Sequence, residues 1–366
     1  MLTRFAVANF RGFAHRIEWD LSSPGSYEFN AHVVKKGIIK NGIIYGPNGS
    51  GKTNFGQAIF DIVNHLTQKN KKPDYYQNFV YGGNPDLQVK FEYVFDFGGQ
   101  SIEYGYSKNI YGALIDEVLV VDGLQVFKWR VGELKIDEKQ FPISKEIKKN
   151  IQASSNNISI VNYLHSTFPL AEGHYLIRMK GFVDNMLWFR CLKQNEYMGF
   201  DDTSIILDEY IIRNKLVNDF SDFLWKISGQ KFDLVSRRGV NKMLFFRVED
   251  RIVPFDVVAS TGTQSLKLLY FWMKQMERAS FVFIDEFDAF YHFRLAFEVC
   301  KRLFLLNCQV FMSSHNTYLM TNDLLRPDCN FILQNNQLKP LQKCTEKELR
   351  FGHNIEKLFR GGAFEV

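Results

Sequence analysis

The sequence predicts an α/β fold organised around a phosphate-binding loop, and three short segments carry this prediction. Residues 46–53 form the octapeptide GPNGSGKT, which lies between an apolar run at 43–45 and a helical pattern over 54–67. Residues 281–284 form a second apolar run, which ends in an Asp-Glu pair. A third run, at 310–312, ends in Ser-Ser-His-Asn. Each run is therefore expected to be a buried strand that carries polar side chains to a site.

Composition and length limit the kind of protein. The 366 residues are 46% hydrophobic and 23% charged, which predicts a sizeable core in two or three domains and excludes a disordered or collagen-like chain. A formal charge of +5 is compatible with nucleic-acid binding but does not indicate it. No apolar run approaches the length of about 18 residues that a membrane span needs.

The cysteines and the N-terminal segment predict a cytoplasmic protein. The five cysteines are odd in number and never spaced as Cys-x-x-Cys, so neither a disulfide framework nor a zinc site is expected. Arg4, Arg11 and Arg16 interrupt what would be the apolar stretch of a secretion signal, which argues against secretion.

Hydrophobic patterning predicts the remaining elements. A mainly helical stretch is expected over 144–228, and a polar, lysine-rich loop over 68–74. Strands are predicted in residues 2–13, in several pieces separated by glycine turns from 87 to about 135, in 231–238 and in 242–255. No internal repeat and no sustained heptad pattern is visible, so a long coiled coil is not expected.

These elements divide the chain into three predicted regions. Residues 1–140 form an N-terminal lobe with the loop and a strand-rich segment, and residues 231–366 form a C-terminal lobe with the other motifs. Residues 141–230 form a helical insertion between them.

The octapeptide matches the pattern Gly-x-x-x-x-Gly-Lys-Ser/Thr completely. Its glycines let successive backbone N–H groups turn towards phosphate oxygens at the start of a helix. Lys52 is expected to reach the β- and γ-phosphates of ATP, and the Thr53 hydroxyl to bind Mg²⁺. The predicted nucleotide-binding residues here are Gly46, Pro47, Asn48, Gly49, Ser50, Gly51, Lys52, Thr53 and Asn54.

The other two runs add candidate catalytic residues. Asp285 is expected to bind the metal, directly or through water, and Glu286 to act as the general base on the attacking water. His315 is expected to contact the γ-phosphate. An apolar run followed by Asp-Glu is weak evidence alone, and it becomes strong when paired with the loop.

A fourth segment precedes the Asp-Glu pair. Ser260 and Gly262 open an amphipathic run, which is either a capped helix start or a helix N-terminus aimed at the nucleotide of another subunit.

The order of these motifs resembles the ABC-type ATPase heads of the SMC, RecF and OLD families. Residues 9–13, NFRGF, resemble the Asn-Phe-Arg-x-Phe opening of those heads, which implies that Arg11 approaches the phosphates. The segments YGPNGSGKTNF (45–55), FIDEFDAF (283–290), SSHNTYLM (313–320) and NIEKLFRGGAFE (354–365) look like the compact ATPases of prokaryotic phage-defence and abortive-infection loci. The resemblance covers residues 1–135 and 230–366.

The resemblance implies a head-to-tail homodimer or higher homo-oligomer. Each ATP would lie between Lys52 of one chain and Ser260 and Gly262 of the other, with Asp288 either at that interface or a solvated loop carboxylate. The chain departs from the family where Ser-Thr-Gly-Thr replaces the signature Leu-Ser-Gly-Gly-Gln, and Gln77 is the candidate for the glutamine that joins the lobes.

The resulting functional hypothesis is a Mg²⁺-dependent ATPase that senses or scaffolds in an anti-phage system and controls an effector, a nuclease encoded by a neighbouring gene. The alternative is a RecF-like ATPase that binds DNA in repair or recombination through two groups of lysines, which are otherwise solvated surface. Those lysines are Lys69, Lys71, Lys72, Lys145, Lys148 and Lys149. A transporter ATPase subunit is disfavoured by the opening motif and the insertion.

Overall fold

A mostly parallel sheet of seven strands carries the predicted loop. The structure is a computed structural model that describes residues 1–67, 69, 73–153, 159–190, 196–200, 206–237 and 240–365. The sheet has the order β12-β11-β16-β17-β5-β18-β19, with five central parallel strands and an antiparallel strand at each edge. Its strands are β5 (Asn41–Tyr45), β11 (Met186–Arg190), β12 (Tyr197–Met198), β16 (Phe281–Asp285), β17 (Gln309–Ser314), β18 (Asn330–Gln334) and β19 (Gln337–Pro340).

The strands that flank the loop are buried on both faces. Every residue of β5, β16 and β17 is buried, which explains why each strand contains a continuous apolar run (43–45, 281–284 and 310–312) rather than an alternating pattern. The α/β fold with a phosphate loop at a strand end, as predicted, is thereby confirmed.

A second sheet of seven strands is antiparallel and has the order β10-β9-β8-β7-β6-β1-β2. Along β6 buried residues alternate with more accessible ones, as expected for a sheet with one face against the core. The prediction of strands from residue 87 to about 135 is confirmed. The strands are β1 (Leu2–Ala8), β2 (Ile17–Asp20), β6 (Gln88–Asp96), β7 (Ser101–Asn109), β8 (Leu114–Val121), β9 (Leu124–Arg130) and β10 (Glu133–Ile136).

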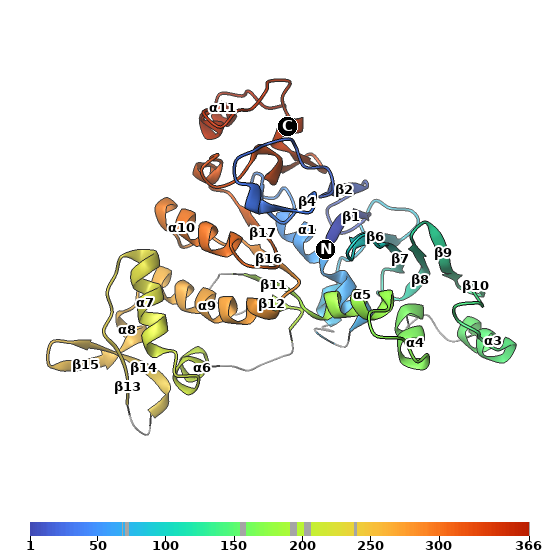
Figure 1. Ribbon diagram of the computed structural model, residues 1–366, viewed down its shortest axis with the longest axis horizontal. Coiled ribbons are helices and arrows are strands. Elements are labelled where there is room, and N and C mark those ends of the chain that lie inside the picture. Colours follow the sequence, from blue (N-terminus) through green and yellow to red (C-terminus); the bar gives the residue numbers. More distant parts are fainter. Residues whose placement is uncertain are drawn as a thin grey trace.

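The helix that follows the loop lies between the two sheets. Figure 1 shows α1 (Lys52–Ile59) with β16 and β17 on one side and β1 and β6 on the other. The Phe55 ring contacts Phe5 from the antiparallel sheet at 5.7 Å between centroids, and Trp19 at 5.6 Å. Trp19 also contacts Phe311 of the parallel sheet at 4.5 Å. These aromatic contacts fix the helix, and with it the loop, relative to both sheets.

The sequence prediction is wrong at β11. Residues 144–228 were expected to be mainly helical, yet 186–190 form a strand parallel to β16, with Arg190 directly opposite Asp285. Residues 186–189 are almost fully buried, and a short buried apolar run cannot be told from a buried helix by periodicity alone. The boundaries of the three predicted regions stay a prediction.

Helices surround this strand in the same stretch, and a third sheet follows. The helices are α3 (Lys145–Ala153), α4 (Ile160–Thr167), α5 (Tyr175–Asp184), α6 (Leu207–Arg213) and α7 (Val217–Ser228). The third sheet consists of β13 (Leu234–Arg237), β14 (Val240–Val248) and β15 (Arg251–Pro254). The helices that come after it in the chain are α8 (Phe255–Val258), α9 (Thr261–Gln275) and α10 (Phe293–Phe304). In Figure 1 the third sheet lies at the lower left, away from the antiparallel sheet.

Short elements complete the described chain. They are α2 (Asp61–Leu66), α11 (Ile355–Arg360), β3 (Val34–Lys35), β4 (Ile38–Ile39), and the 3-10 helices η1 (Ala31–Val33), η2 (Pro73–Tyr76), η3 (Met276–Arg278), η4 (Thr317–Leu319), η5 (Pro327–Cys329) and η6 (Leu341–Lys343). Among the described residues no helix has the length and apolar character needed to span a bilayer. Cys300, Cys308, Cys329 and Cys344 are buried free thiols, and Cys191 lies outside the described residues.

A buried ion pair joins α2 to the antiparallel sheet. The Lys108 ammonium lies 2.6 Å from Oδ1 of Asp61, and the Tyr106 hydroxyl donates to the same oxygen at 2.8 Å. Asp61 is fully buried and Lys108 is 2% exposed. Because both groups are removed from water, losing either charge would leave the other poorly compensated.

Replacing one member of this pair should be costly. Lys108→Met leaves a buried carboxylate without its cation, and we expect a loss of about 3–5 kcal/mol in the free energy of unfolding, measured by urea denaturation. The double variant Lys108→Met, Asp61→Asn should recover part of that loss. The matched control, Lys135→Met in the exposed pair with Glu133, should leave the midpoint nearly unchanged. A single variant as stable as the wild type would contradict the assignment.

Candidate nucleotide site

The carboxyl ends of four parallel strands meet at one edge of the sheet. Arg190 at the end of β11 pairs in register with Asp285 at the end of β16, and Ser314 at the end of β17 pairs with Tyr45 at the end of β5. The octapeptide begins directly after Tyr45. In open α/β sheets ligands bind at this edge, so the topology brings three of the predicted motifs to one place.

The loop has the backbone conformation that its glycines predict. Gly49 and Gly51 have φ angles of 79° and 97°, which side-chain-bearing residues rarely adopt. A Cβ atom on Gly51 would lie 2.6 Å from Cε1 of Phe13, and one on Gly46 would lie 2.4 Å from the carbonyl oxygen of Leu333. The Ser50 Oγ atom is buried and has no partner among the described residues. An unpartnered hydroxyl in a glycine-rich turn fits a phosphate oxygen.

Lys52 lies folded over this loop. Its ammonium group donates to the carbonyl oxygens of Gly46 at 2.8 Å and Pro47 at 3.1 Å, and the residue is only 5% exposed. Burial lowers the pKa of Lys52, and the nearby carboxylates of Asp285 and Glu286 oppose that shift. The positive charge of Lys52 thus lies at the loop, where a bound phosphate would contact it.

His315 follows the end of β17 and lies beside Lys52. Its Nδ1 atom is 3.4 Å from the Lys52 ammonium nitrogen. Partial burial and the Lys52 charge lower the pKa of His315 from its ordinary value of 6.5. The imidazole is therefore mainly neutral at pH 7, with one donor and one acceptor nitrogen. The structure thus places Lys52 and His315 side by side, and the contact of each with a phosphate stays a prediction.

Asp285 is the centre of the polar contacts at this edge. The residue is fully buried, and its Oδ1 atom accepts a hydrogen bond from the Ser313 hydroxyl at 2.7 Å. Its Oδ2 atom accepts from the Thr53 hydroxyl at 2.8 Å and from Nε of Arg190 at 2.9 Å. Thr53 and Asp285, the two predicted metal-binding residues, thus come together from opposite ends of the sequence.

Glu286 occupies an unusual backbone conformation. Its φ angle is 49°, in the left-handed region, and its N–H donates to the Ser313 hydroxyl at 2.8 Å. A side-chain-bearing residue in this region costs on the order of 1 kcal/mol, and such residues cluster at functional sites. The turn leaves the Glu286 side chain one-third exposed while Asp285 stays buried.

Arg190 is a site residue that the sequence analysis missed. Besides Asp285, its guanidinium reaches Oγ1 of Thr53 at 3.2 Å and a carboxylate oxygen of Glu196 at 3.4 Å. Burial lowers the pKa of Arg190, but the charges of Asp285 and Glu196 outweigh it and the net shift is upward. The missing signal was the assignment of 186–190 to a strand, because only the strand places Arg190 opposite Asp285.

Arg11 lies against the first turns of α1. Its own φ is 50°, and its guanidinium donates to Oδ1 of Asn54 at 3.4 Å, to the Gln57 side chain, and to the carbonyl oxygen of Tyr75 at 3.3 Å. Burial lowers the pKa of Arg11. Arg11 therefore contacts Asn54, which follows the octapeptide, and its approach to phosphate stays a prediction.

Ser260 and Gly262 are not part of this cluster. Ser260 caps α9 by accepting from the Thr263 N–H at 3.2 Å, and a Cβ on Gly262 would lie 3.1 Å from the carbonyl oxygen of Phe290. No hydrogen bond or ion pair in the described part of the chain joins either residue to loop 46–53. In Figure 1 α8, just before Ser260, lies at the lower left, whereas α1 lies near the centre.

Two other predicted positions have local roles. Asp288 accepts a hydrogen bond from the Ser314 hydroxyl at 2.7 Å, and burial raises the pKa of Asp288. It thus holds the strand end that precedes His315. Gln77 is exposed, and its N–H donates to the carbonyl oxygen of Asp74 at 3.1 Å. In the described chain no side-chain hydrogen bond of Gln77 reaches the loop.

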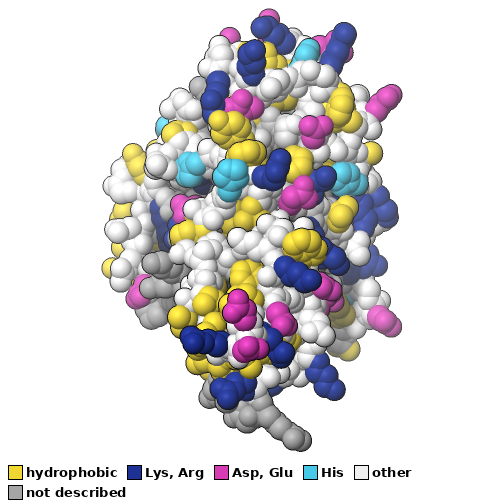
Figure 2. Space-filling view, turned by 90° about the vertical axis from the view of Figure 1, so that its left-hand side faces the viewer, with side chains coloured by type: hydrophobic (Ala, Val, Ile, Leu, Met, Phe, Trp, Pro, Cys, Tyr) yellow, Lys and Arg dark blue, Asp and Glu magenta, His cyan; other side chains and the backbone are white. Residues whose placement is uncertain are grey.

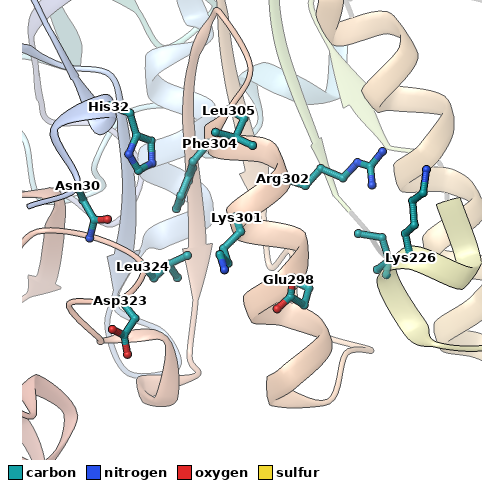
Figure 3. Close-up of a pocket in the computed structure, with 11 residues that line it drawn as sticks. Asn30, His32, Lys226, Glu298, Lys301, Arg302, Phe304, Leu305, Asp323 and Leu324 are labelled. Atoms are coloured by element: carbon teal, nitrogen blue, oxygen red, sulfur yellow. The ribbon is translucent and has the colours of Figure 1, made fainter.

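A separate hollow of about 530 Å³ is lined by residues of α7 and α10, by the C-cap of α10, and by residues 30, 32, 323 and 324. Figure 3 shows Lys226 on α7 and Arg302 on α10 near each other, with Lys301 and Glu298 on the same helix as Arg302. The Arg302 guanidinium lies over the Phe223 ring at 5.6 Å. None of the predicted site residues lines this hollow, so it is distinct from the loop site.

Comparisons with solved structures give matches of low identity. The SMC head domain from Thermotoga maritima is 15% identical, with a TM-score of 0.45 over 92% of this chain and 97% of that chain. An SMC head bound to the C-terminal winged-helix domain of ScpA is 12% identical, with a TM-score of 0.47 over 92% and 96%. The recombination mediator protein RecF-ATPrS of the RecFOR pathway is 16% identical, with a TM-score of 0.40 over 93% and 98%. Likeness at this level assigns no function.

A comparison with protein families is more decisive. The model described as "AAA domain, putative AbiEii toxin, Type IV TA system" matches residues 43–321, which include the octapeptide, the Asp-Glu pair and His315. No curated protein matches the chain. The predicted likeness to ATPases of abortive-infection systems is confirmed by the family match. Because the match spans well over half of the chain, this protein belongs to the family of AAA domains described as putative AbiEii toxins of type IV toxin–antitoxin systems.

Proposed function

We propose that this protein is a Mg²⁺-dependent ATPase that acts as a sensor or scaffold in a cytoplasmic anti-phage system. One observation carries the proposal. The Thr53 hydroxyl of the loop helix and the Asp285 carboxylate of β16 meet at 2.8 Å, next to a loop that carries the buried Lys52 ammonium and the unpartnered Ser50 hydroxyl. A hydroxyl and a carboxylate are hard oxygen donors, which fit Mg²⁺ when phosphate oxygens supply other ligands.

The binding step follows from the loop. Its backbone N–H groups and the Lys52 ammonium would hold the β- and γ-phosphates, and Thr53 and Asp285 would hold Mg²⁺. The metal would supply positive charge to the phosphate oxygens during transfer. Since Lys52 now donates to Gly46 and Pro47, phosphate binding would exchange those carbonyls for phosphate oxygens.

The hydrolytic step would use the two strand ends. Glu286 directly follows Asp285, and its turned backbone carries the carboxylate out of the core, where it can accept a proton from the attacking water. The neutral imidazole of His315, beside Lys52, would donate a hydrogen bond to the γ-phosphate and so distinguish ATP from ADP.

We further propose that Ser260 and Gly262 complete the site of a second chain. Ser260 is the N-cap of α9 and Gly262 lies in its first turn, and the N-terminus of a helix favours anions through its dipole and its backbone N–H groups. Ser260 is exposed and Gly262 is partly exposed, so a neighbouring chain can reach them. A nucleotide held by two chains would make the dimer depend on ATP, which would let the protein control an effector, a nuclease from a neighbouring gene.

The alternative, DNA binding in repair or recombination, receives no specific support from the structure. The Lys69 ammonium donates to the carbonyl oxygen of Asp184 at 2.8 Å, and Lys148 pairs with Glu138 at 3.0 Å. Lys145 and Lys149 are exposed on α3, and Lys71 and Lys72 lie outside the described residues. On the face in Figure 2, basic and acidic side chains are interspersed. The ATPase proposal is therefore the one we develop.

Two substitutions should separate ATP binding from hydrolysis. Lys52→Ala removes the loop cation and should weaken ATP binding at least tenfold, with the fold retained, because the ammonium supplies charge and little packing.

Glu286→Gln should bind ATP normally and lower kcat by about 10²–10⁴-fold, the usual contribution of a general base. Calorimetric ATP titration and phosphate release measure the two effects. Unchanged ATP affinity in the first variant, or wild-type turnover in the second, would refute the corresponding role.

Mixing two inactive variants should test the shared site. Gly262→Asp places a carboxylate at the N-terminus of α9, where it would repel the partner chain's γ-phosphate, so hydrolysis and dimerisation should be lost while each chain still binds ATP. A heterodimer of Gly262→Asp with excess Lys52→Ala has one site with both lesions and one with neither. Phosphate release should therefore reappear on mixing, up to the fraction of heterodimer formed.

A control separates charge from packing in this experiment. Because a Cβ on Gly262 would lie 3.1 Å from the Phe290 carbonyl, Gly262→Ala reports the steric effect alone and should retain most activity. If mixed dimers form without any recovery of phosphate release, the site is self-contained and the dimer proposal is wrong.

A further inference from the structure

The Arg190 guanidinium occupies the atoms that would hold a metal ion. Its Nε donates to Oδ2 of Asp285 at 2.9 Å, and its Nη2 reaches Oγ1 of Thr53 at 3.2 Å. The side chain is 24% exposed, so most of this contact is shielded from water. Thr53 and Asp285 are the two residues assigned to Mg²⁺, and Arg190 is the third member of their cluster.

The hydrogen bonds of Asp285 show where a metal could enter. Its Oδ1 atom is engaged by the Ser313 hydroxyl, which leaves Oδ2 as the oxygen facing Thr53. The Thr53 hydroxyl can go on donating its hydrogen bond to Oδ2 of Asp285, and its oxygen still has a lone pair that could bind a metal. Arg190 covers both that lone pair and Oδ2. A dication at these oxygens and a guanidinium within 3.2 Å of both would repel each other strongly.

We propose that Arg190 is a positioning residue that holds Thr53 and Asp285 as a surrogate cation, and that Mg²⁺ binds only by displacing it. The inference rests on the proposed ATPase function. Its consequence is that Arg190 lowers the affinity of the site for metal and restricts loading to metal that arrives with nucleotide phosphates, which supply the additional ligands.

A displaced Arg190 has other carboxylates within reach. Its Nη1 atom lies 3.4 Å from a carboxylate oxygen of Glu196, and its Nη2 atom lies 3.9 Å from one of Glu286. A small movement would therefore exchange Asp285 for partners that are 47% and 33% exposed. After this movement the Arg190 guanidinium would still be paired with a carboxylate, that of Glu196 or of Glu286.

The experiment measures metal affinity without turnover. The full-length protein is stripped of metal, saturated with ATPγS and titrated with Mn²⁺, and free Mn²⁺ is followed by electron paramagnetic resonance. Arg190→Gln should bind Mn²⁺ more tightly than the wild type by about tenfold, within the range of 5- to 150-fold that couples two linked occupants. Arg190→Lys keeps the positive charge but cannot contact Asp285 and Thr53 at the same time through a planar guanidinium. Its affinity for Mn²⁺ should therefore fall between those of the wild type and Arg190→Gln.

Thermal unfolding gives a second readout. In chelator, Arg190→Gln should melt below the wild type, because Asp285 is left buried without its cation. Mn²⁺ with ATPγS should then raise its Tm by more than it raises that of the wild type. The matched control is Arg213→Gln, an exposed arginine paired with Glu209 on α6, which should change neither the Mn²⁺ affinity nor this gain.

The outcomes separate this inference from the proposed function. If the wild type binds ATPγS and Arg190→Gln binds Mn²⁺ no more tightly, Arg190 does not compete with metal and the inference alone is overturned. Weaker binding of both ATPγS and Mn²⁺ would overturn it too, since Arg190 would then be a phosphate ligand. If the wild type binds no ATPγS, the ATPase proposal and the inference are both refuted. Should Arg190→Gln be insoluble, Arg190→Lys decides by the same comparison.

Discussion

A single buried carboxylate, that of Asp285, constrains the whole site. Removing a charged carboxylate from water is costly unless hydrogen bonds and an opposite charge compensate it, and Asp285 is fully buried. Its compensation comes from Thr53 on α1, Ser313 on β17 and Arg190 on β11, three segments far apart in the sequence. The cost of burying this one group is met only when all three segments are in place, so the site and the parallel sheet depend on each other.

The position of α1 follows from the same constraint. Thr53 can reach Asp285 only if the loop helix lies against β16, and the rings of Phe5, Trp19 and Phe55 hold the helix between the two sheets. None of the predicted catalytic residues lies in the antiparallel sheet. Its role is to fix the helix that carries Lys52 and Thr53. A chain with the loop motif but without this packing would not keep Thr53 against Asp285.

Much of this site could be predicted from the sequence because its signals are local. The glycines of the octapeptide predict the loop conformation that Gly49 and Gly51 adopt, and the Asp-Glu pair after the apolar run 281–284 becomes a strong signal once it is paired with that loop. Arg190 could not be found in this way. Its importance depends on the register of β11 against β16, a pairing between residues 95 positions apart, and the apolar run 186–189 is equally compatible with a buried helix. The left-handed turn at Glu286 likewise has no sequence signal.

The central claim is that this edge of the sheet binds a metal-nucleotide complex with Asp285 and Thr53 at the metal. The most direct test is a crystal structure of the protein grown with Mn²⁺ and ATPγS, in which the anomalous signal locates the metal. We expect one anomalous peak bonded to the Thr53 hydroxyl and to Asp285, directly or through water, with the β- and γ-phosphates enclosed by loop 46–53. Triphosphate bound outside that loop, or a metal peak away from Asp285, would contradict the account.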